Sequence, residues 1–335
     1  MYRHVQHCHV QNRIVHVVRL HFFGDGMLRH GVGRQDVVRL IQGADMTEKL
    51  TSKIIGQREK FLLYGAPKKG GKTFTALTAP EPILFHAIGG PNEAKTYFSK
   101  DFQNKHGPKD IVIDVVVEDL DKKGRCKNPV GFDHACNLLD EALEADDRGE
   151  LPTETGGFET LVVDNGTVLS EFQMNKVIHI ANSFRNAQAK GMSTYDKLMQ
   201  EGILVPHDSD WGGAQSLMRD YISWLFKLDK HVVFIAHEYE QTKANRATQS
   251  SDLIGIKPLF IGQQRDRIAN LFDNVWRCTK QGQMYIARTV PADKPIDIIA
   301  GTRLGGIVDN DYIDPNITKT IEKFKKHAES IEKNL

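Results

Sequence analysis

The stretch from Phe61 to Thr73 constrains the fold most strongly, because it joins an apolar strand to a helix through a loop of glycine and lysine. Small residues let successive backbone N–H groups converge on one point, and the helix N-terminus adds partial positive charge. This order of elements predicts a phosphate-binding loop, in which Lys72 reaches the β- and γ-phosphates and the Thr73 hydroxyl binds Mg²⁺. A Gly/Lys-rich surface turn is the alternative interpretation of so short a stretch.

The spacing of this loop allows two alignments. The usual pattern is a glycine, four further residues and then Gly-Lys-Ser/Thr. Counting back from Gly71 gives Ala66 the first position, whereas Gly65 would require one extra residue in the loop. We expect Ala66 to fill that position. The predicted phosphate-binding residues are then Ala66, Pro67, Lys68, Lys69, Gly70, Gly71, Lys72, Thr73 and Phe74.

Composition excludes several classes of protein. Over 335 residues the formal net charge is +1, which argues against a strongly basic nucleic-acid-binding surface but not against a local basic groove. The four cysteines form no Cys-x-x-Cys pair, so neither a zinc ribbon nor a disulfide framework is indicated, and a reduced cytosolic compartment is expected. No apolar run approaches the roughly 20 residues of a membrane-spanning helix.

Residues 1–45 differ from the rest of the chain, because they contain no lysine and no glutamate while histidine and arginine are frequent. A His-rich tract can bind metal, but these histidines have no regular ligand spacing. The segment is acid-poor like a targeting peptide, yet it is not rich in serine. We expect a poorly integrated extension over residues 1–45, with the main domain beginning at Met46.

From Met46 onward, apolar segments of strand length alternate with segments of helical pattern. Strands are predicted at 61–65, 83–88, 111–117, 160–164 and 231–236, and helices at 92–103, 132–148, 168–184 and 214–228. Continuous apolar strands between helices predict an α/β fold with a mostly parallel sheet and helices on both faces. Strands at 274–278 and 284–290 flank a turn and predict a C-terminal β-hairpin region. This domain is expected to span 46–310, followed by a charged helix in 311–335.

Polar residues stand at the ends of three predicted strands, where ligands of parallel sheets bind. Asp164 is expected to hold Mg²⁺ beside Thr73, although an aspartate before a turn is common. His237 is expected to face the γ-phosphate, with a capping or core histidine as the alternative. Arg303 follows a predicted last strand at 296–300, where it can contact a phosphate of its own chain or of a neighbouring subunit, or remain a surface arginine.

From Met46 to about Gly306, the chain resembles the RecA-like P-loop ATPases of phages and prophages, which are often described as AAA-domain NTP-binding proteins. The motifs that carry the resemblance are the loop from Tyr64 to Thr73, Leu161 to Asp164, Val232 to Glu238, Lys257 to Leu259, Phe272 to Val275, and Thr302 to Gly305. The resemblance implies a RecA-like P-loop NTPase fold that binds ATP and Mg²⁺ and hydrolyses ATP. Lys72, His237 and Arg303 would be catalytic.

Two departures from the family pattern concern hydrolysis. RecA-like enzymes place the acidic residue that activates water at the end of the strand after the loop helix, but residues 83–88 here end without a carboxylate. Glu118 is our preferred substitute because it follows the next strand, and Glu93 is the alternative. The family also often has a lysine two residues before the arginine, where this chain has Gly301.

The resemblance further implies phage-type DNA recombination, single-strand annealing or repair in the cytoplasm of a bacterial host cell. Its partners would be single-stranded DNA, a single-strand-binding protein and further copies of the chain, with no membrane association. The expected polar loops at 186–212 and 239–256 supply the candidate DNA contacts, Lys190 to Trp211 and Lys243 to Lys257.

Two other functions remain open. A nucleotide-gated assembly protein with weak or no hydrolysis is favoured by the missing carboxylate. A small-molecule kinase would share the loop, although no Arg-rich lid is present. The sequence contains no Asn-Lys-x-Asp motif, which favours ATP over GTP.

Overall fold

The computed structural model describes residues 58–68, 70–149, 157–188, 206–245, 250–262, 264–292 and 295–333. The expected extension over residues 1–45 lies outside the described residues, as do Lys69 of the loop and most of the segment 186–212. In the described part of the chain, no helix is both long and apolar enough to cross a membrane.

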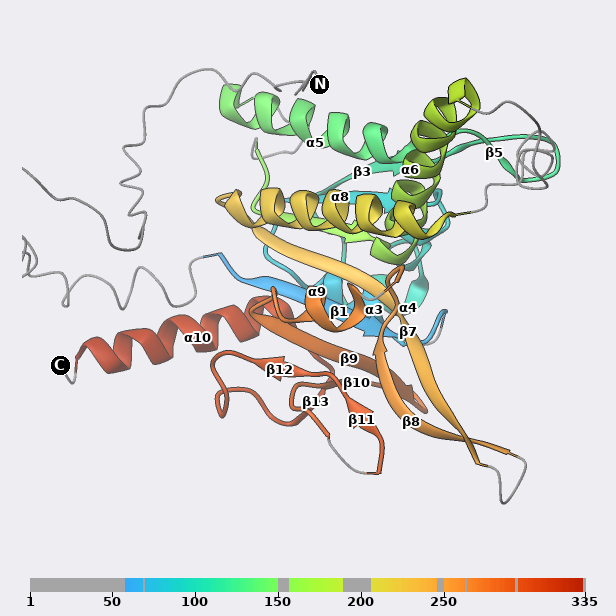
Figure 1. Cartoon of the computed structure of the whole chain (residues 1–335). Coiled ribbons are helices and arrows are strands. Elements are labelled where there is room, and N and C mark those ends of the chain that lie inside the picture. Colours follow the sequence, from blue (N-terminus) through green and yellow to red (C-terminus); the bar gives the residue numbers. More distant parts are fainter. Residues whose placement is uncertain are drawn as a thin grey trace, which may run out of the picture. The chain divides into compact units, whose positions relative to one another are not determined.

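A large, mostly parallel sheet forms the centre of the described fold (Figure 1), as the sequence predicts. Its main path has the strand order β13-β10-β9-β1-β7-β6-β2-β3. The run from β9 to β3 is parallel, and β10 and β13 extend it with antiparallel pairing. The strand bounds are β1 Lys60–Gly65, β2 Ile83–Ile88, β3 Ile111–Val116, β6 Thr160–Asp164, β7 His231–Asn245, β9 Asn274–Gln281, β10 Met284–Arg288 and β13 Asp311–Ile313.

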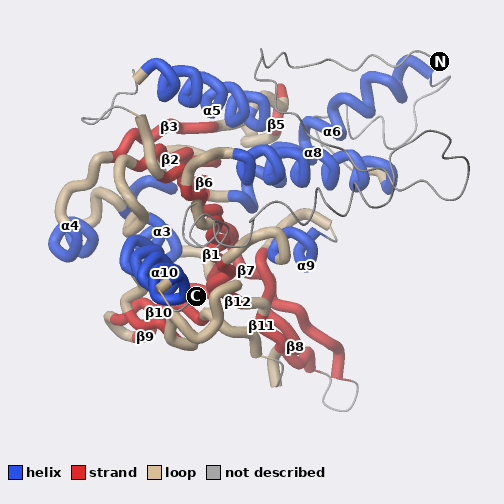
Figure 2. Tube along the Cα trace, turned by 90° about the vertical axis from the view of Figure 1, so that its left-hand side faces the viewer, coloured by secondary structure: helices blue, strands red, loops and turns tan. Residues whose placement is uncertain are grey.

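Helices cover both faces of this sheet (Figure 2), which confirms the predicted layering. One face packs against α5 (Gly131–Arg148), α6 (Gly166–Gln188), α8 (Asp208–Lys227) and the short α9 (Gln264–Ala269). The other face packs against α3 (Lys72–Ala76), α4 (Lys100–His106) and α10 (Ile317–Glu332).

Strand β1 shows why the central strands read as continuous apolar runs. Its side chains alternate between the two faces, because successive residues of a strand point in opposite directions. Leu62 and Tyr64 belong to the core under α6 and α8, whereas Phe61 and Leu63 belong to the core under α3 and α10. All four side chains are fully buried. A strand between two helical layers therefore needs apolar residues at every position.

The C-terminal segment continues the same domain. Strand β13 pairs with β10 at the edge of the sheet. Helix α10 then places Ile317, Ile321 and Phe324 in the core that also holds Phe61 and Phe74. The charged helix expected over 311–335 is thus amphipathic, with its apolar side against the sheet.

The polar segment 239–256 was expected to be a loop, and the structure corrects this expectation. Strand β7 continues past the sheet to Asn245 and pairs antiparallel with β8 (Ser250–Pro258), forming a long hairpin (Figure 1). Backbone pairing holds the hairpin together, while its outer half carries polar, exposed side chains. A two-sided polar strand lacks the hydrophobic alternation that makes strands recognisable in a sequence.

Two shorter segments also differ from expectation. Residues 92–103 form a 3₁₀ turn, η1 (Glu93–Thr96), and then α4, because the Ser99 side chain accepts a hydrogen bond from Phe102 N and starts a new helix. The predicted strand at 296–300 divides into β11 (Asp297–Ile298), which pairs with β8, and β12 (Gly301–Thr302), which pairs with β9. A small hairpin of β4 (Asp119–Leu120) and β5 (Cys126–Asn128) follows β3.

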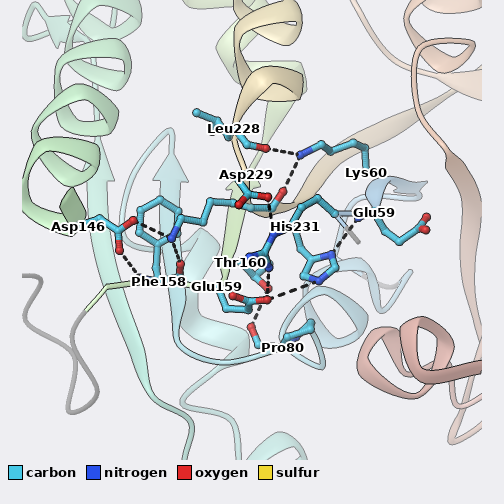
Figure 3. Close-up of polar contacts among 12 residues, drawn as sticks. Glu59, Lys60, Pro80, Asp146, Phe158, Glu159, Thr160, Leu228, Asp229 and His231 are labelled. Atoms are coloured by element: carbon cyan, nitrogen blue, oxygen red, sulfur yellow. Dashed lines mark hydrogen bonds and ion pairs between the residues drawn. The ribbon is translucent and has the colours of Figure 1, made fainter. Parts of the chain in front are cut away.

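A network of polar contacts joins the amino-terminal ends of β1, β6 and β7 (Figure 3). Lys60 Nζ donates to the carbonyl oxygens of Leu228 and Lys230 at 3.1 and 2.6 Å. The buried His231 ring accepts from Glu59 N at 3.0 Å through Nδ1, and burial lowers the pKa of His231 to about 3. These groups satisfy one another, so this edge of the sheet is held by internal contacts.

Candidate functional site

The predicted phosphate-binding loop lies at the carboxyl-terminal edge of the parallel strands. It follows the last residue of β1, Gly65, which pairs in register with His237 of β7. Strand β6, on the other side of β7, ends at Asp164. The sheet therefore brings the loop, Asp164 and His237 to one edge, as the sequence predicts.

Lys72 is a buried cation whose ammonium group donates to neutral backbone oxygens of the loop. Its Nζ donates to the carbonyls of Gly65 at 3.1 Å and Ala66 at 2.8 Å. Burial lowers its pKa, and the nearby carboxylate of Asp164 opposes that shift. No carboxylate of the described residues forms an ion pair with Lys72, so a bound polyanion would supply the missing opposite charge.

Packing against β9 and β10 explains two of the loop glycines. A Cβ atom at Gly65 would collide with the carbonyl oxygen of Cys278, and one at Gly71 would collide with the ring of Tyr285. Gly71 also has a φ of 72°, in the left-handed region that favours glycine. Packing against Cys278 therefore accounts for Gly65 at the end of β1. The alignment that gives Ala66 the first position of the loop stays a prediction.

Thr73 and Asp164 form the predicted metal-binding pair. The Thr73 hydroxyl donates to Asp164 Oδ2 at 2.6 Å. Burial raises the pKa of Asp164 to about 7, with the Thr73 hydrogen bond acting in the opposite direction. A hydroxyl and a carboxylate are hard oxygen ligands, and Mg²⁺ is commonly bound through one or two carboxylates together with substrate phosphates. These residues therefore fit Mg²⁺, which when bound would neutralise phosphate charge.

His237 lies beside this pair and is held from two directions. Its backbone N donates to Thr167 Oγ1 at 2.9 Å, and Asn165 Nδ2 lies 3.2 Å from its Nε2. Burial lowers the pKa of His237, and the positive charge of Lys72 lowers it further. The ring is thus a neutral polar group at neutral pH, and it lies within electrostatic range of the loop lysine. Asn165 was not predicted as a site residue, although it directly follows Asp164 in the sequence.

The two candidate water-activating carboxylates have different surroundings. Glu93, on η1, interacts electrostatically with both Lys72 and Asp164, and burial raises its pKa. Glu118 Oε2 instead accepts from Gly131 N at 3.1 Å, at the start of α5. Both glutamates line a cavity of about 550 Å³, but the electrostatic link to the loop lysine belongs to Glu93. The electrostatic interaction with Lys72 supports Glu93 as the candidate, and the preference for Glu118 drawn from the sequence stays a prediction.

A family model for an AAA domain matches residues 57–304. The chain belongs to this AAA domain family. The matched region contains the loop, Asp164 and His237. An AAA domain indicates nucleotide binding and ATPase activity. No curated protein matches the chain.

Arg303 lies within the matched region of the AAA domain but at the opposite edge of its sheet. Its guanidinium pairs with Asp273 Oδ1 at 3.1 Å, and the other carboxylate oxygen of Asp273 accepts from Lys60 N at the start of β1. A six-residue strand spans roughly 16 Å, so this position is far from the loop after Gly65. The expectation that Arg303 contacts a phosphate of its own chain is wrong, because β12 runs antiparallel to β9 and returns the chain to the amino-terminal edge.

A cavity of about 240 Å³ adjoins the loop of the AAA domain on the side of β9 and β10. Loop residues and two side chains from the β9–β10 hairpin, Lys280 and Tyr285, line it. Sequence reasoning missed both side chains, because they lie more than two hundred residues after the loop and belong to no motif. Its described lining residues are Lys68, Gly70, Gly71, Lys72, Thr73, Phe74, Thr96, Lys280 and Tyr285.

Proposed function

We propose that this protein is a Mg²⁺-dependent ATPase whose active site lies at the carboxyl-terminal edge of the sheet. The observation that carries the proposal is the buried ammonium of Lys72, which forms no ion pair with a carboxylate of the described residues, next to the hydrogen-bonded pair of Thr73 and Asp164. Lys72 and the loop amides bind the β- and γ-phosphates, while Thr73 and Asp164 hold the metal ion. Phosphoryl transfer relies mainly on positioning and electrostatics, which such a site supplies.

Glu93 orients the attacking water in this proposal, and His237 with Asn165 senses the γ-phosphate. The electrostatic contacts of Glu93 with Lys72 and Asp164 support its role. A neutral His237 paired with an amide can donate or accept a hydrogen bond as the phosphate changes. Glu118 then serves to hold the start of α5 through Gly131.

A nucleotide-gated assembly protein with weak hydrolysis is the second candidate. It is supported by the absence of a carboxylate at the end of β2, where Ile88 is followed by Gly89 and Gly90.

The nucleotide state is coupled to the β7–β8 hairpin, because His237 and the hairpin belong to the same strand. We assign single-stranded DNA as the target of this hairpin, in keeping with a role in recombination, annealing or repair, alone or with a single-strand-binding protein. Lys243, in the described part of the hairpin, is exposed. Lys257 Nζ lies 3.9 Å from Asp297 Oδ2. Arg246 and most of the segment from Lys190 to Trp211 lie outside the described residues.

Phosphate release separates these functions. The purified chain is assayed with ATP in Mg²⁺, in EDTA, and in Mg²⁺ with single-stranded DNA at several salt concentrations. Release that needs Mg²⁺ supports the ATPase, and stimulation that falls steeply with salt supports DNA coupling. Tight ATP binding without release supports the gated assembly protein. Failure to bind ATP at all would refute both.

A further inference from the structure

We propose that the β9–β10 hairpin forms the nucleoside-binding wall of the site, with the nucleobase stacked on Tyr285 and Lys280 directed at the phosphates. This inference rests on the proposed nucleotide binding and adds the residues that recognise the nucleoside. It begins from the 240 Å³ cavity beside the loop, to which the hairpin contributes Lys280 and Tyr285. Ligand pockets usually measure about 300 to 1,000 Å³, so this space fits part of a nucleotide.

Sheet order places the cavity on the nucleoside side of the site. Strand β1 lies between β7 and β9. The groups proposed to face the γ-phosphate and metal, Asp164 and His237, come from β6 and β7 on one side of β1. The cavity lies toward β9 and β10 on the other side. A nucleotide whose γ-phosphate points toward β6 therefore has its nucleoside at the hairpin.

The hairpin is fixed to the loop by close backbone packing. The carbonyl of Cys278 lies where a side chain at Gly65 or Gly70 would have to be, and the ring of Tyr285 lies against Gly71. Within the hairpin, Tyr285 pairs directly with Lys280. Since side chains of one paired position share a face of the sheet, both point toward the loop.

The ring of Tyr285 is a preformed stacking surface. Phe74 stacks on it with the ring centroids 4.3 Å apart and the planes at 26°. Lys280 Nζ lies 4.8 Å from the same ring centroid. Lys280 Nζ also donates to the Tyr285 hydroxyl oxygen at 3.4 Å, so its ammonium lies at the hydroxyl end of the ring. Because Phe74 covers one face of the ring, the opposite face is the one that would receive a base. The Lys280 side chain is exposed and flexible, so it can move from the ring to the negatively charged phosphates when a nucleotide enters.

If the nucleobase stacks on Tyr285, removing the ring should weaken the binding of every nucleotide to a similar extent, because every base has a π-face. Removing the ring in Tyr285→Ala is expected to weaken ATP binding by about 5- to 150-fold and to weaken GTP binding similarly. Tyr285→Phe keeps the ring and should bind ATP like the unchanged protein. Lys280→Ala should weaken ATP and inorganic tripolyphosphate alike, because Lys280 contacts phosphate.

The test compares ATP with inorganic tripolyphosphate by competition against a fluorescent ATP analogue in Mg²⁺. Tyr285→Ala should lose affinity for ATP and keep that for tripolyphosphate, so the ratio of the two affinities falls. A purely structural role of Tyr285 in supporting the loop would weaken both ligands equally and would overturn the inference. So would an unchanged ATP affinity in Tyr285→Ala.

The proposed function fails by a separate result. If Lys72→Ala binds ATP and tripolyphosphate as the unchanged protein does, phosphate binding by the loop is refuted, whatever Tyr285 does. If Lys72→Ala loses both ligands while Tyr285→Ala changes neither, the loop binds phosphate and the nucleoside wall lies elsewhere.

Discussion

Two buried lysines at opposite ends of β1 share their chemistry but differ in their surroundings. Lys60 begins the strand and Lys72 follows the loop at its far end. Each donates to two backbone carbonyls, and burial lowers the pKa of each, that of Lys60 to about 8. A buried lysine with a lowered pKa is therefore not by itself evidence of function.

The neighbours of the two lysines separate their roles. At the amino-terminal edge, Lys60 lies beside groups that pair among themselves, as Arg58 does with Asp229 and Glu159. At the carboxyl-terminal edge, Lys72 lines a cavity and lies next to the linked Thr73 and Asp164. The polar groups of the carboxyl-terminal edge border a cavity that a ligand can enter, whereas those of the amino-terminal edge are closed by their own contacts and stabilise the fold.

The largest expected difference concerns the two glutamates near the carboxyl-terminal edge. Glu93→Gln should lower the rate of phosphate release by about 10²- to 10⁴-fold, the usual contribution of a positioned acid or base. Glu118→Gln keeps an oxygen that can accept from Gly131 N and should leave the rate nearly unchanged. Steady-state phosphate release at saturating ATP measures both variants. A larger loss in Glu118→Gln would return the catalytic role to that residue.

Two threonines allow the two ends of β6 to be compared, because Thr73 donates to Asp164 at its last residue and Thr160 is its first residue. Thr73→Val removes the hydroxyl that donates to Asp164 and should weaken Mg²⁺-ATP binding by about 10- to 150-fold. Thr160→Val removes a buried hydrogen bond to the Pro80 carbonyl at the start of β6. It should cost about 1 kcal/mol of stability and no ATP affinity. Calorimetric titration measures the ATP affinity of each variant, and denaturant unfolding measures its stability. Equal losses of ATP affinity in Thr73→Val and Thr160→Val would contradict the proposal that only the carboxyl-terminal edge binds ATP.

Because of His231 at the amino-terminal edge, the free energy of unfolding should depend on pH. Burial lowers the pKa of His231 to about 3 in the folded chain, against about 6.5 when unfolded. The unfolded chain therefore binds more protons between these values, so stability is present above pH 6.5 and falls as the pH drops toward 3. Between these pKa values, the free energy of unfolding changes by about 1.4 kcal/mol per pH unit for one such group.

His231→Asn provides the control for this slope, since its side-chain oxygen can still accept from Glu59 N. Denaturant unfolding at several pH values should show a shallower acid dependence in this variant. An identical dependence in both proteins would show that His231 does not contribute.

The smallest effect is expected at Arg303, which the structure places at the amino-terminal edge with Asp273. The Arg303 side chain is 65% exposed, and exposed ion pairs contribute about 0 to 1 kcal/mol. Arg303→Ala should therefore change stability by less than about 1 kcal/mol and leave ATP affinity of the single chain unchanged. A large loss of activity that appears only at high protein concentration would instead support a role for Arg303 in a neighbouring subunit.

Sequence reasoning correctly predicted that the loop, Asp164 and His237 lie at the same edge of the sheet. The loop follows β1, Asp164 is the last residue of β6, and His237 follows the buried apolar part of β7. Parallel pairing brings these positions together. Tyr285 was not recognisable because its distance from Gly71 depends on how β9 and β10 pack against the loop. Arg303 was misplaced because the direction of β12, a strand of two residues, cannot be inferred from its sequence.

The rest of the fold also separates into elements that the sequence pattern predicted and elements that it did not. Predictions held where both faces of a strand or one side of a helix are apolar, as in β1 and α5. They failed in the polar β7–β8 hairpin, where backbone pairing rather than side-chain pattern sets the structure. The choice between Glu93 and Glu118 also required the structure, because both follow strands and only their neighbours differ.

The most direct test of the contrast between the two edges is calorimetric titration of Mg²⁺-ATP into Lys72→Met and Lys60→Met. Methionine retains much of the apolar stem of lysine in both variants and removes the charge. We expect Lys72→Met to lose ATP affinity by about 100-fold or more, on the order of what an uncompensated buried charge pair costs, and Lys60→Met to bind ATP like the unchanged protein. Equal affinity in the two variants would contradict this expectation.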